Sequence, residues 1–263
     1  MRFTKMQGLG NDYLYVFGDV PENAPEISRR LSDRRFGAGS DGMIYISGSS
    51  TADFSMRIFN ADGSEAEMCG NGIRCVGKYV YDKGYTDRKT LTVETLSGIK
   101  KLSLDVRRGK VRSVSVEMGQ AKTGDDVTVA VRGKRLVCTP VSVGNPHAVF
   151  FTENAETVPL EEIGPVIEYA PVFGRRVNVE FASVMPGNTV RMRVWERGSG
   201  ITMACGTGAC AAAAAAVKKK LCSADVPVTV VLDGGKLTVN VSRDGLITMT
   251  GPAETVYEGE TEI

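Results

Sequence analysis

Two cysteines open the same short motif in different parts of the chain, Cys69-Gly70-Asn71-Gly72 and Cys205-Gly206-Thr207-Gly208. Each motif precedes a segment predicted to be helical, residues 71–83 and 209–221, so each cysteine is expected at a helix N-terminus. The first N–H groups of a helix have no intrahelical acceptor and carry a partial positive charge, which binds carboxylates and favours a thiolate. The glycines let a ligand approach the backbone closely. The motif therefore predicts reactive thiols beside a carboxylate site.

The two cysteine motifs belong to a longer internal repeat. Residues 56–60, Met-Arg-Ile-Phe-Asn, align with residues 192–196, Met-Arg-Val-Trp-Glu, and in both copies the cysteine follows nine residues later. A Gly-Asn pair precedes the cysteine by a similar interval in each copy, at Gly10-Asn11 and at Gly144-Asn145. Three matches in the same order indicate two copies of one structural unit.

Two such units that face each other would place a sulfur on either side of one bound α-carbon. One thiolate could then remove the α-proton while the opposite thiol returns a proton to the other face. The charge of the carbanion would spread onto a carboxylate already held by helix N-termini. The repeat therefore favours inversion of stereochemistry at a carbon next to a carboxylate.

Strand signals dominate the rest of the chain. Alternating apolar residues between turn signals predict strands within residues 90–96, 102–118, 127–137 and 227–250. Weaker helical patterns occupy residues 25–36 and 159–169. Many strands with few helices, arranged in two sets, predict an α+β fold.

Composition and charge exclude several classes of function. Lysine plus arginine number 32 against 31 aspartate plus glutamate, so a net charge of +1 favours neither nucleic acid nor a membrane surface as a partner. No signal-peptide core and no membrane-spanning apolar run is found, so a cytoplasmic location is expected. Six cysteines without a C-x-x-C pair, and a single histidine, His147, do not favour a metal site or a serine hydrolase.

Seven segments together resemble the diaminopimelate epimerase family. They begin with residues 5–12, Lys-Met-Gln-Gly-Leu-Gly-Asn-Asp, and include residues 59–64, Phe-Asn-Ala-Asp-Gly-Ser, and the two cysteine motifs. The others are Gly144-Asn145-Pro146-His147, Arg176-Val177-Asn178 and residues 195–198, Trp-Glu-Arg-Gly. They follow the family's order over essentially the whole chain. The related proline racemases share the cysteine pair but lack the opening segment and the Trp-Glu-Arg-Gly block.

The resemblance implies two similar pseudo-symmetric domains, each a strand-rich unit wrapped around a central helix. The first comprises residues 1–113, completed by residues 252–263, and the second comprises residues 114–251. It also implies epimerisation of LL-diaminopimelate to meso-diaminopimelate without a cofactor, a step towards lysine and, in many bacteria, peptidoglycan. A homodimer acting on this small-molecule substrate is expected.

The resemblance assigns roles residue by residue. Cys69 and Cys205 match the two acid/base residues. The positions whose backbone holds the reacting α-carboxylate are matched by Gly70, Asn71, Gly206 and Thr207. The positions that recognise the distal amino-acid end are matched by Asn60, Asn145, Asn178 and Arg197, with Asn11 nearby. Glu196 matches the group beside the α-ammonium, and Glu196 and His147 match the residues that tune the cysteines. Gly42 departs from those members that bind substrate through a glutamine there.

Two other functions remain open. A thiol redox sensor would use the same cysteine pair, but it gives no role to the polar set Asn60, Asn145, Asn178, Glu196 and Arg197. A racemase of the proline or hydroxyproline type would need no cluster of amides and arginine, because its substrate has no charged distal end. Testing a panel of substrates would separate these alternatives.

Overall fold

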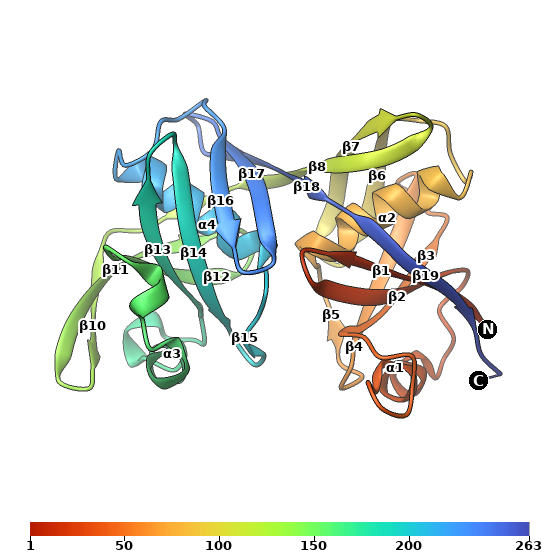
Figure 1. The fold of residues 1–263 in the computed structure, drawn as a ribbon, viewed down its shortest axis with the longest axis horizontal. Coiled ribbons are helices and arrows are strands. Elements are labelled where there is room, and N and C mark those ends of the chain that lie inside the picture. The colour runs from red at the N-terminus through yellow and green to blue at the C-terminus, as the bar shows by residue number, and fades with distance from the viewer. Residues whose placement is uncertain (263) are drawn as a thin grey trace. The chain divides into compact units, whose positions relative to one another are not determined.

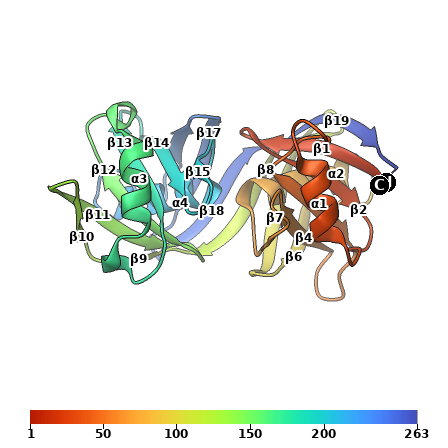
Figure 2. The same ribbon diagram turned by 90° about the horizontal axis from the view of Figure 1, so that it is seen from below.

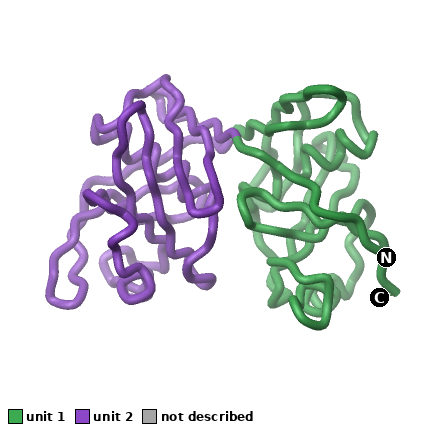
Figure 3. The backbone as a smooth tube through the Cα atoms, viewed as in Figure 1, with its two compact units in different colours: residues 1–117, 251–263 green, residues 118–250 purple. Residues whose placement is uncertain are grey.

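The computed structural model describes residues 1–262, and the chain divides into two compact units. Unit 1 comprises Met1–Glu117 with Gly251–Ile263, and unit 2 comprises Met118–Thr250 (Figure 3). The chain passes from one unit to the other inside two strands, β8 (Lys110–Gln120) and β18 (Leu246–Pro252). These crossings lie at 117/118 and 250/251, a few residues from the expected boundaries at 113/114 and 251/252.

The strands of unit 1 pair in a regular order. β1 pairs antiparallel with β2, β2 parallel with β3, β3 antiparallel with β4, and β4 parallel with β6. β6, β7 and β8 then follow as an antiparallel meander, and the C-terminal strand β19 pairs with β1. The elements are β1 Arg2–Gly8, β2 Asn11–Phe17, α1 Ala24–Ser32, β3 Gly42–Ser47, β4 Phe54–Asn60, β5 Glu65–Ala66, α2 Gly70–Asp82, β6 Thr90–Thr95, β7 Gly98–Arg107 and β19 Glu254–Glu260.

Unit 2 repeats this order. β11 pairs antiparallel with β12, β12 parallel with β13, β13 antiparallel with β14, and β14 parallel with β16, before the β16–β17–β18 meander. The elements are β9 Lys122–Thr123, β10 Val127–Val131, β11 Lys134–Ser142, β12 Pro146–Phe151, α3 Leu160–Glu168, β13 Asn178–Met185, β14 Thr189–Glu196, β15 Gly200–Ile201, α4 Gly206–Lys218, β16 Val228–Leu232 and β17 Gly235–Val241, with short 3-10 turns at Ala155–Thr157 and Pro171–Phe173. The repeated pairing confirms the α+β fold of two similar units.

Successive side chains along a strand point to opposite faces of the sheet, and in each unit the two faces pack against different helices. In β13, Val179 and Phe181 join the apolar cluster beneath α3, whereas Glu180 between them faces α4. In β3, Tyr45 lies in the cluster beneath α1, whereas Ile44 faces α2. In each unit one helix is therefore enclosed by strands and the other lies outside them (Figures 1 and 2).

The two cysteine motifs begin helices as predicted, but α4 spans Gly206–Lys218 and so begins and ends three residues before the predicted bounds of 209–221. Cys69 and Cys205 are the N-cap residues of α2 and α4, which confirms the two helices expected after the cysteine motifs. The pattern at residues 25–36 gives a shorter helix, because α1 ends at Ser32. Asp33 leaves the helical conformation, and its carboxylate accepts the N–H groups of Arg35 and Phe36. Within residues 1–262, no helix has the length and apolar character needed to cross a membrane.

Alanine lets α4 pack in the interior of unit 2. The residues from Ala211 to Ala216 are all buried, five of them with no exposed surface and Ala214 with 4%. Strands surround the helix, with β11, β12, β13, β14, β16 and β17 in contact with it. A methyl group is therefore the largest side chain that this part of the helix accommodates without displacement of the strands.

Enlarging a buried alanine of α4 should destabilise the protein. Ala213→Leu forces three further carbon atoms into a filled interior and should lower the free energy of unfolding by about 1–3 kcal/mol. Urea denaturation measures this change. The control Ala130→Leu, on the exposed side of β10, should change it by less than about 0.5 kcal/mol. Equal midpoints for the two variants would contradict this packing.

Candidate active site

In unit 1, the sulfur of Cys69 caps α2. Cys69 Sγ accepts the N–H of Gly72 at 3.3 Å. The thiol also donates to Asn11 Oδ1, with 3.3 Å between sulfur and oxygen. The amide of Asn11 is turned this way because its Nδ2 donates to Asp41 Oδ2 at 2.7 Å. The Asn11 carbonyl therefore favours the protonated form of Cys69.

The other expected residues of unit 1 lie in two places. Gly70 and Asn71 form the first turn of α2, where the buried guanidinium of Arg74 donates to Gly70 O at 3.1 Å and to Asn71 Oδ1 at 2.9 Å. Asn60 ends β4 and donates from Nδ2 to Ser64 Oγ at 3.0 Å. Asn60 therefore lies in the turn after β4, whereas Gly70 and Asn71 present their backbone at the helix start.

In unit 2, the sulfur of Cys205 caps α4 in the same way. Cys205 Sγ accepts the N–H of Gly208 at 3.3 Å and lies 3.5 Å from Thr207 Oγ1. Burial raises the pKa of Cys205 well above its usual value, and the negative charges of Glu196 and Glu180 raise it further. The hydrogen bonds from Thr207 and Gly208 act in the opposite direction and favour the thiolate.

His147 lies at the centre of a buried group of polar side chains. His147 Nδ1 is 2.6 Å from Glu180 Oε1, and both side chains are completely buried. His147 Nε2 is 2.9 Å from Asn145 Oδ1, and Asn145 Nδ2 donates to Thr207 Oγ1 at 3.2 Å. The structure thus brings three expected residues, Asn145, His147 and Thr207, into one network next to Cys205.

Glu196 is the last residue of β14, and Arg197 begins the turn that follows. Asn178 Oδ1 accepts the backbone N–H of Arg197 at 2.9 Å, and the Arg197 side chain is exposed. Glu196 accepts a hydrogen bond from the Thr202 hydroxyl. Burial raises the pKa of Glu196, an effect only partly offset by its hydrogen bonds. Asn178 therefore fixes the backbone of the turn while Arg197 remains available to a ligand.

Three residues that the sequence analysis did not select contribute to these surroundings. Glu180 contacts His147, and the hydroxyl of Tyr13 lies within hydrogen-bonding reach of Asn11 and Cys69. Burial raises the pKa of Tyr13, and the neighbouring Cys69 raises it further. Glu168 accepts Trp195 Nε1 at 2.7 Å and the N–H of Gly198 at 3.1 Å, and so holds the turn after β14. Strand alternation could have found Glu180, since it is two residues from Asn178.

Gly42 is required by the backbone around it. A Cβ atom at this position would lie 2.2 Å from the carbonyl oxygen of Phe59 and 2.9 Å from Cε1 of Tyr13. The first of these atoms belongs to the neighbouring strand β4 and cannot move aside cheaply. With this backbone, the glutamine found in some members of the resembled family does not fit, and the ring of Tyr13 occupies the adjacent space.

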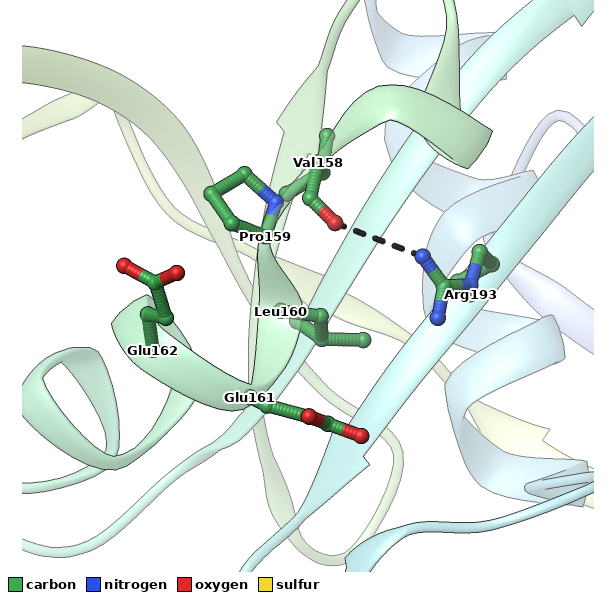
Figure 4. Close-up of a pocket in the computed structure, with 6 residues that line it drawn as sticks. All are labelled: Val158, Pro159, Leu160, Glu161, Glu162 and Arg193. Carbon is green, nitrogen blue, oxygen red and sulfur yellow. Dashed lines mark hydrogen bonds between the residues drawn. The ribbon is translucent and has the colours of Figure 1, made fainter.

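A surface pocket lies elsewhere in unit 2. It has a volume of about 230 Å³ and is lined by the start of α3 and by Arg193 (Figure 4). Arg193 Nη1 donates to Val158 O at 3.3 Å. None of the expected site residues lines this pocket, so it is not the candidate site. Within residues 1–262, no three histidine, cysteine, aspartate or glutamate side chains lie together as a metal site would require.

Comparison with solved structures defines the fold class. The chain is similar to a PhzF-family phenazine biosynthesis protein of Bacillus anthracis, with a TM-score of 0.81, 17% identity, and coverage of 100% of this chain and 99% of that chain. It is also similar to a probable proline racemase of Agrobacterium radiobacter, with a TM-score of 0.76, 16% identity, and coverage of 100% and 93%. The protein therefore has the two-unit α+β fold that PhzF-like and proline racemase-like proteins share.

Comparison of sequences defines the family within this class. The family model described as diaminopimelate epimerase matches residues 3–124 and 139–256. The diaminopimelate epimerase of Acetivibrio thermocellus is 48% identical over 279 aligned residues, which cover 100% of this chain and 99% of that relative. The chain belongs to the diaminopimelate epimerase family, and is therefore an isomerase of the epimerase type. The resemblance read from the motifs is confirmed.

The raised pKa of Glu196 predicts a pH-dependent effect on stability. A carboxyl group whose pKa is higher in the folded than in the unfolded protein contributes stability at low pH and loses it as pH rises through the folded pKa. Glu196→Gln removes the buried charge, so the melting temperature should exceed that of the wild type at pH 7. The difference should vanish toward pH 4, where the wild-type carboxyl is protonated. A lower melting temperature at pH 7, measured by calorimetry, would contradict the assignment.

Proposed function

We propose that this protein converts LL-2,6-diaminopimelate to meso-diaminopimelate by a two-cysteine acid/base mechanism that needs no cofactor. The observation that carries the proposal is the matched position of Cys69 and Cys205, each the N-cap of the central helix of its unit. Family membership supports the choice of substrate. Each unit is then an epimerase domain that supplies one of the two cysteines.

The helix starts would bind the reacting carboxylate. The backbone at Gly70 and Asn71 begins α2, and that at Gly206 and Thr207 begins α4. The first N–H groups of a helix have no intrahelical acceptor, and they and the partial positive charge of each helix start favour a carboxylate. Because the same donors also stabilise the enediolate form of the carbanion, they would lower the barrier to removal of the α-proton.

The two sulfurs would carry out the proton transfers. One cysteine, as thiolate, takes the α-proton and becomes a thiol, while the other, as thiol, gives its proton to the opposite face of the α-carbon and becomes a thiolate. Charge and protons balance, and the reverse reaction exchanges the roles. A substrate ammonium beside Glu196 would offset one of the negative charges that raise the pKa of Cys205. Substrate binding would thereby help to activate this cysteine.

The distal end of the substrate would be recognised by Arg197 and a set of amides. The planar guanidinium of Arg197 is exposed on a turn with a fixed backbone, and it can pair with a carboxylate through two hydrogen bonds. Amide side chains can accept from an ammonium and donate to a carboxylate. We assign this role to Asn60, Asn145 and Asn178, with Asn11 nearby.

Further expectations rest on the family alone. We propose that the protein is a homodimer, that it acts in the cytoplasm and that its product serves lysine or peptidoglycan biosynthesis. His147 and Glu196 are proposed to tune the cysteines. No separate observation favours the proline-type racemase or the redox sensor.

Solvent deuterium provides the decisive test of the reaction. Reduced protein is incubated with LL-diaminopimelate in D2O without any added cofactor, and the α-carbon is followed by NMR and mass spectrometry. We expect meso product carrying one deuterium at the inverted centre. Absence of exchange in fully reduced protein would refute the substrate assignment, and proline and hydroxyproline would then be tested.

Removal of either sulfur should abolish epimerisation. Cys69→Ala and Cys205→Ala each leave one face of the α-carbon without a proton donor or acceptor, so kcat should fall by roughly 10²–10⁴-fold. Cys222→Ala, a buried cysteine outside the motifs, serves as the matched control and should keep wild-type activity. Full activity in either motif variant would contradict the two-base mechanism.

Removal of the Arg197 side chain should weaken recognition of the distal end. Arg197→Ala should lower kcat/KM for diaminopimelate by roughly 10- to 100-fold, mainly through KM, because a charged hydrogen-bond partner is lost. Arg243→Ala, at an exposed arginine of the same unit, is the control. Unchanged kinetics for Arg197→Ala would remove this residue from the proposed binding set.

A further inference from the structure

A continuous chain of polar side chains, called here the Glu180 relay, ends at the sulfur of Cys205. Its members in order are Glu180, His147, Asn145, Thr207 and Cys205, joined by contacts of 2.6, 2.9, 3.2 and 3.5 Å. Glu180 is the buried end. Its Oε1 contacts the imidazole, and its Oε2, also buried, has no hydrogen-bond partner within residues 1–262.

Hydrogen-bond accounting fixes where the protons of the relay lie. Asn145 Nδ2 donates to Thr207, so Asn145 Oδ1 faces His147 as an acceptor and His147 Nε2 must carry a proton. The 2.6 Å contact between His147 Nδ1 and Glu180 Oε1 requires one further proton between these atoms. The imidazole and the carboxyl together are then neutral. The absence of a net charge on the pair limits the cost of burying Glu180 with one oxygen unpaired.

The direction of the hydrogen bonds in the Glu180 relay determines whether the hydroxyl hydrogen of Thr207 points at Cys205. Since Thr207 Oγ1 accepts from Asn145, its own hydrogen is free to point at the sulfur 3.5 Å away. A hydroxyl hydrogen directed at sulfur favours the thiolate, in agreement with the lowering effect of Thr207 on the pKa of Cys205. If the relay ran the other way, the Thr207 hydrogen would point at Asn145 instead.

Unit 1 has the same strand pairing, but other side chains stand at the positions that correspond to His147 and Glu180. The parallel pair of His147 with Asn178 corresponds to the pair of Tyr13 with Gly42 in unit 1. An added Cβ at Gly208 would lie 2.8 Å from Glu180 Oε1, and one at the matching Gly72 would lie 2.7 Å from Ile44 Cδ1. An isoleucine thus occupies in unit 1 the place that the carboxyl group of Glu180 occupies in unit 2.

We propose that Glu180 is a positioning residue that sets the direction of this relay. With Glu180 in place, His147 donates from Nε2, and the hydroxyl hydrogen of Thr207 is presented to Cys205. Glu180 touches neither the substrate nor the sulfur in this role. The part of the inference that concerns turnover rests on the proposed function, whereas the part that concerns the protons of His147 does not.

The single histidine of the chain makes the proton positions measurable. Nitrogen-15 histidine labelling reports the two ring nitrogens of His147 without interference from any other histidine. In reduced, ligand-free wild-type protein at pH 7, we expect Nε2 to carry a proton and Nδ1 to share one with Glu180. A ring with bare Nε2 would reverse the relay and overturn the proposal, whatever the activity of the enzyme.

Two substitutions of Glu180 distinguish an effect on the direction of the hydrogen bonds from an effect on packing alone. Glu180→Gln can donate from its amide to Nδ1 while His147 keeps its Nε2 proton, so kcat/KM should stay within roughly threefold of the wild type. Glu180→Leu, which imitates Ile44 of unit 1, should lower kcat/KM roughly tenfold and remove the Nδ1 proton signal. Glu161→Gln, at an exposed glutamate of the same unit, is the control for both. An equal loss in the Gln and Leu variants would contradict the directional role.

A double-mutant cycle tests whether Glu180 acts through Thr207. Thr207→Val removes the hydroxyl at constant size, so Glu180→Leu in that background should cost less than roughly twofold. Independent, multiplicative losses would show that Glu180 only supports the fold and would overturn the proposal. If the wild type does not epimerise diaminopimelate, the proposed function fails, and the NMR spectra of wild type and variants still decide the relay. If the wild type epimerises diaminopimelate but Nε2 of His147 carries no proton, the proposed function is supported and the Glu180 relay is refuted.

Discussion

The contact between a cysteine sulfur and a backbone N–H at the start of a buried helix is the interaction on which the rest of the structure depends. It occurs twice, at 3.3 Å, with Gly72 and with Gly208 as donors. A helix start that lacks side-chain, solvent or ligand partners is unfavourable, and a sulfur at the N-cap satisfies one of its N–H groups. The strands, the alanines of α4 and the glycines of both motifs serve to hold this helix start in place.

The glycines at these donors show how closely the surroundings approach. At Gly208 a Cβ atom would lie 3.2 Å from Cys205 Sγ as well as against Glu180, and at Gly72 it would lie 3.4 Å from Cys69 Sγ as well as against Ile44. Any larger residue would have to displace the buried side chain that faces it, Ile44 or Glu180. The same absence of a side chain leaves the backbone of the first turn open to a carboxylate. Close packing and an open backbone for a carboxylate therefore both require glycine at positions 72 and 208.

The sequence predicts those parts of the site that local signals determine. The helix start at Cys69, the matching start at Cys205 and the α+β class follow from short motifs, turn residues and a repeat. Alternation in β13 places Glu180 on the same face as Asn178, but its contact with His147, 33 positions away in the chain, follows from no local signal. Likewise, α1 ends at Ser32 through a local hydrogen-bonded turn that competes with the helix, and the crossings between units lie inside β8 and β18, strands that continue from one unit into the other. Contacts between distant segments are what a single sequence leaves undetermined.

The repeat preserves the order of the strands but not the groups around the sulfurs, and the proposed chemistry at a stereocentre gives a reason for the difference. The two faces of an α-carbon differ in the positions of the ammonium and the side chain, so two identical half-sites could not both complement one substrate. In unit 1 an amide oxygen of Asn11 accepts from the Cys69 thiol, whereas in unit 2 the hydroxyl of Thr207 can donate to Cys205. In the proposed mechanism one sulfur acts as base and the other as acid, and these unlike partners act on the two sulfurs in opposite directions, while burial and the charges of Glu196 and Glu180 keep the pKa of Cys205 raised. A symmetric pair with two thiols or two thiolates would lack either the base or the acid.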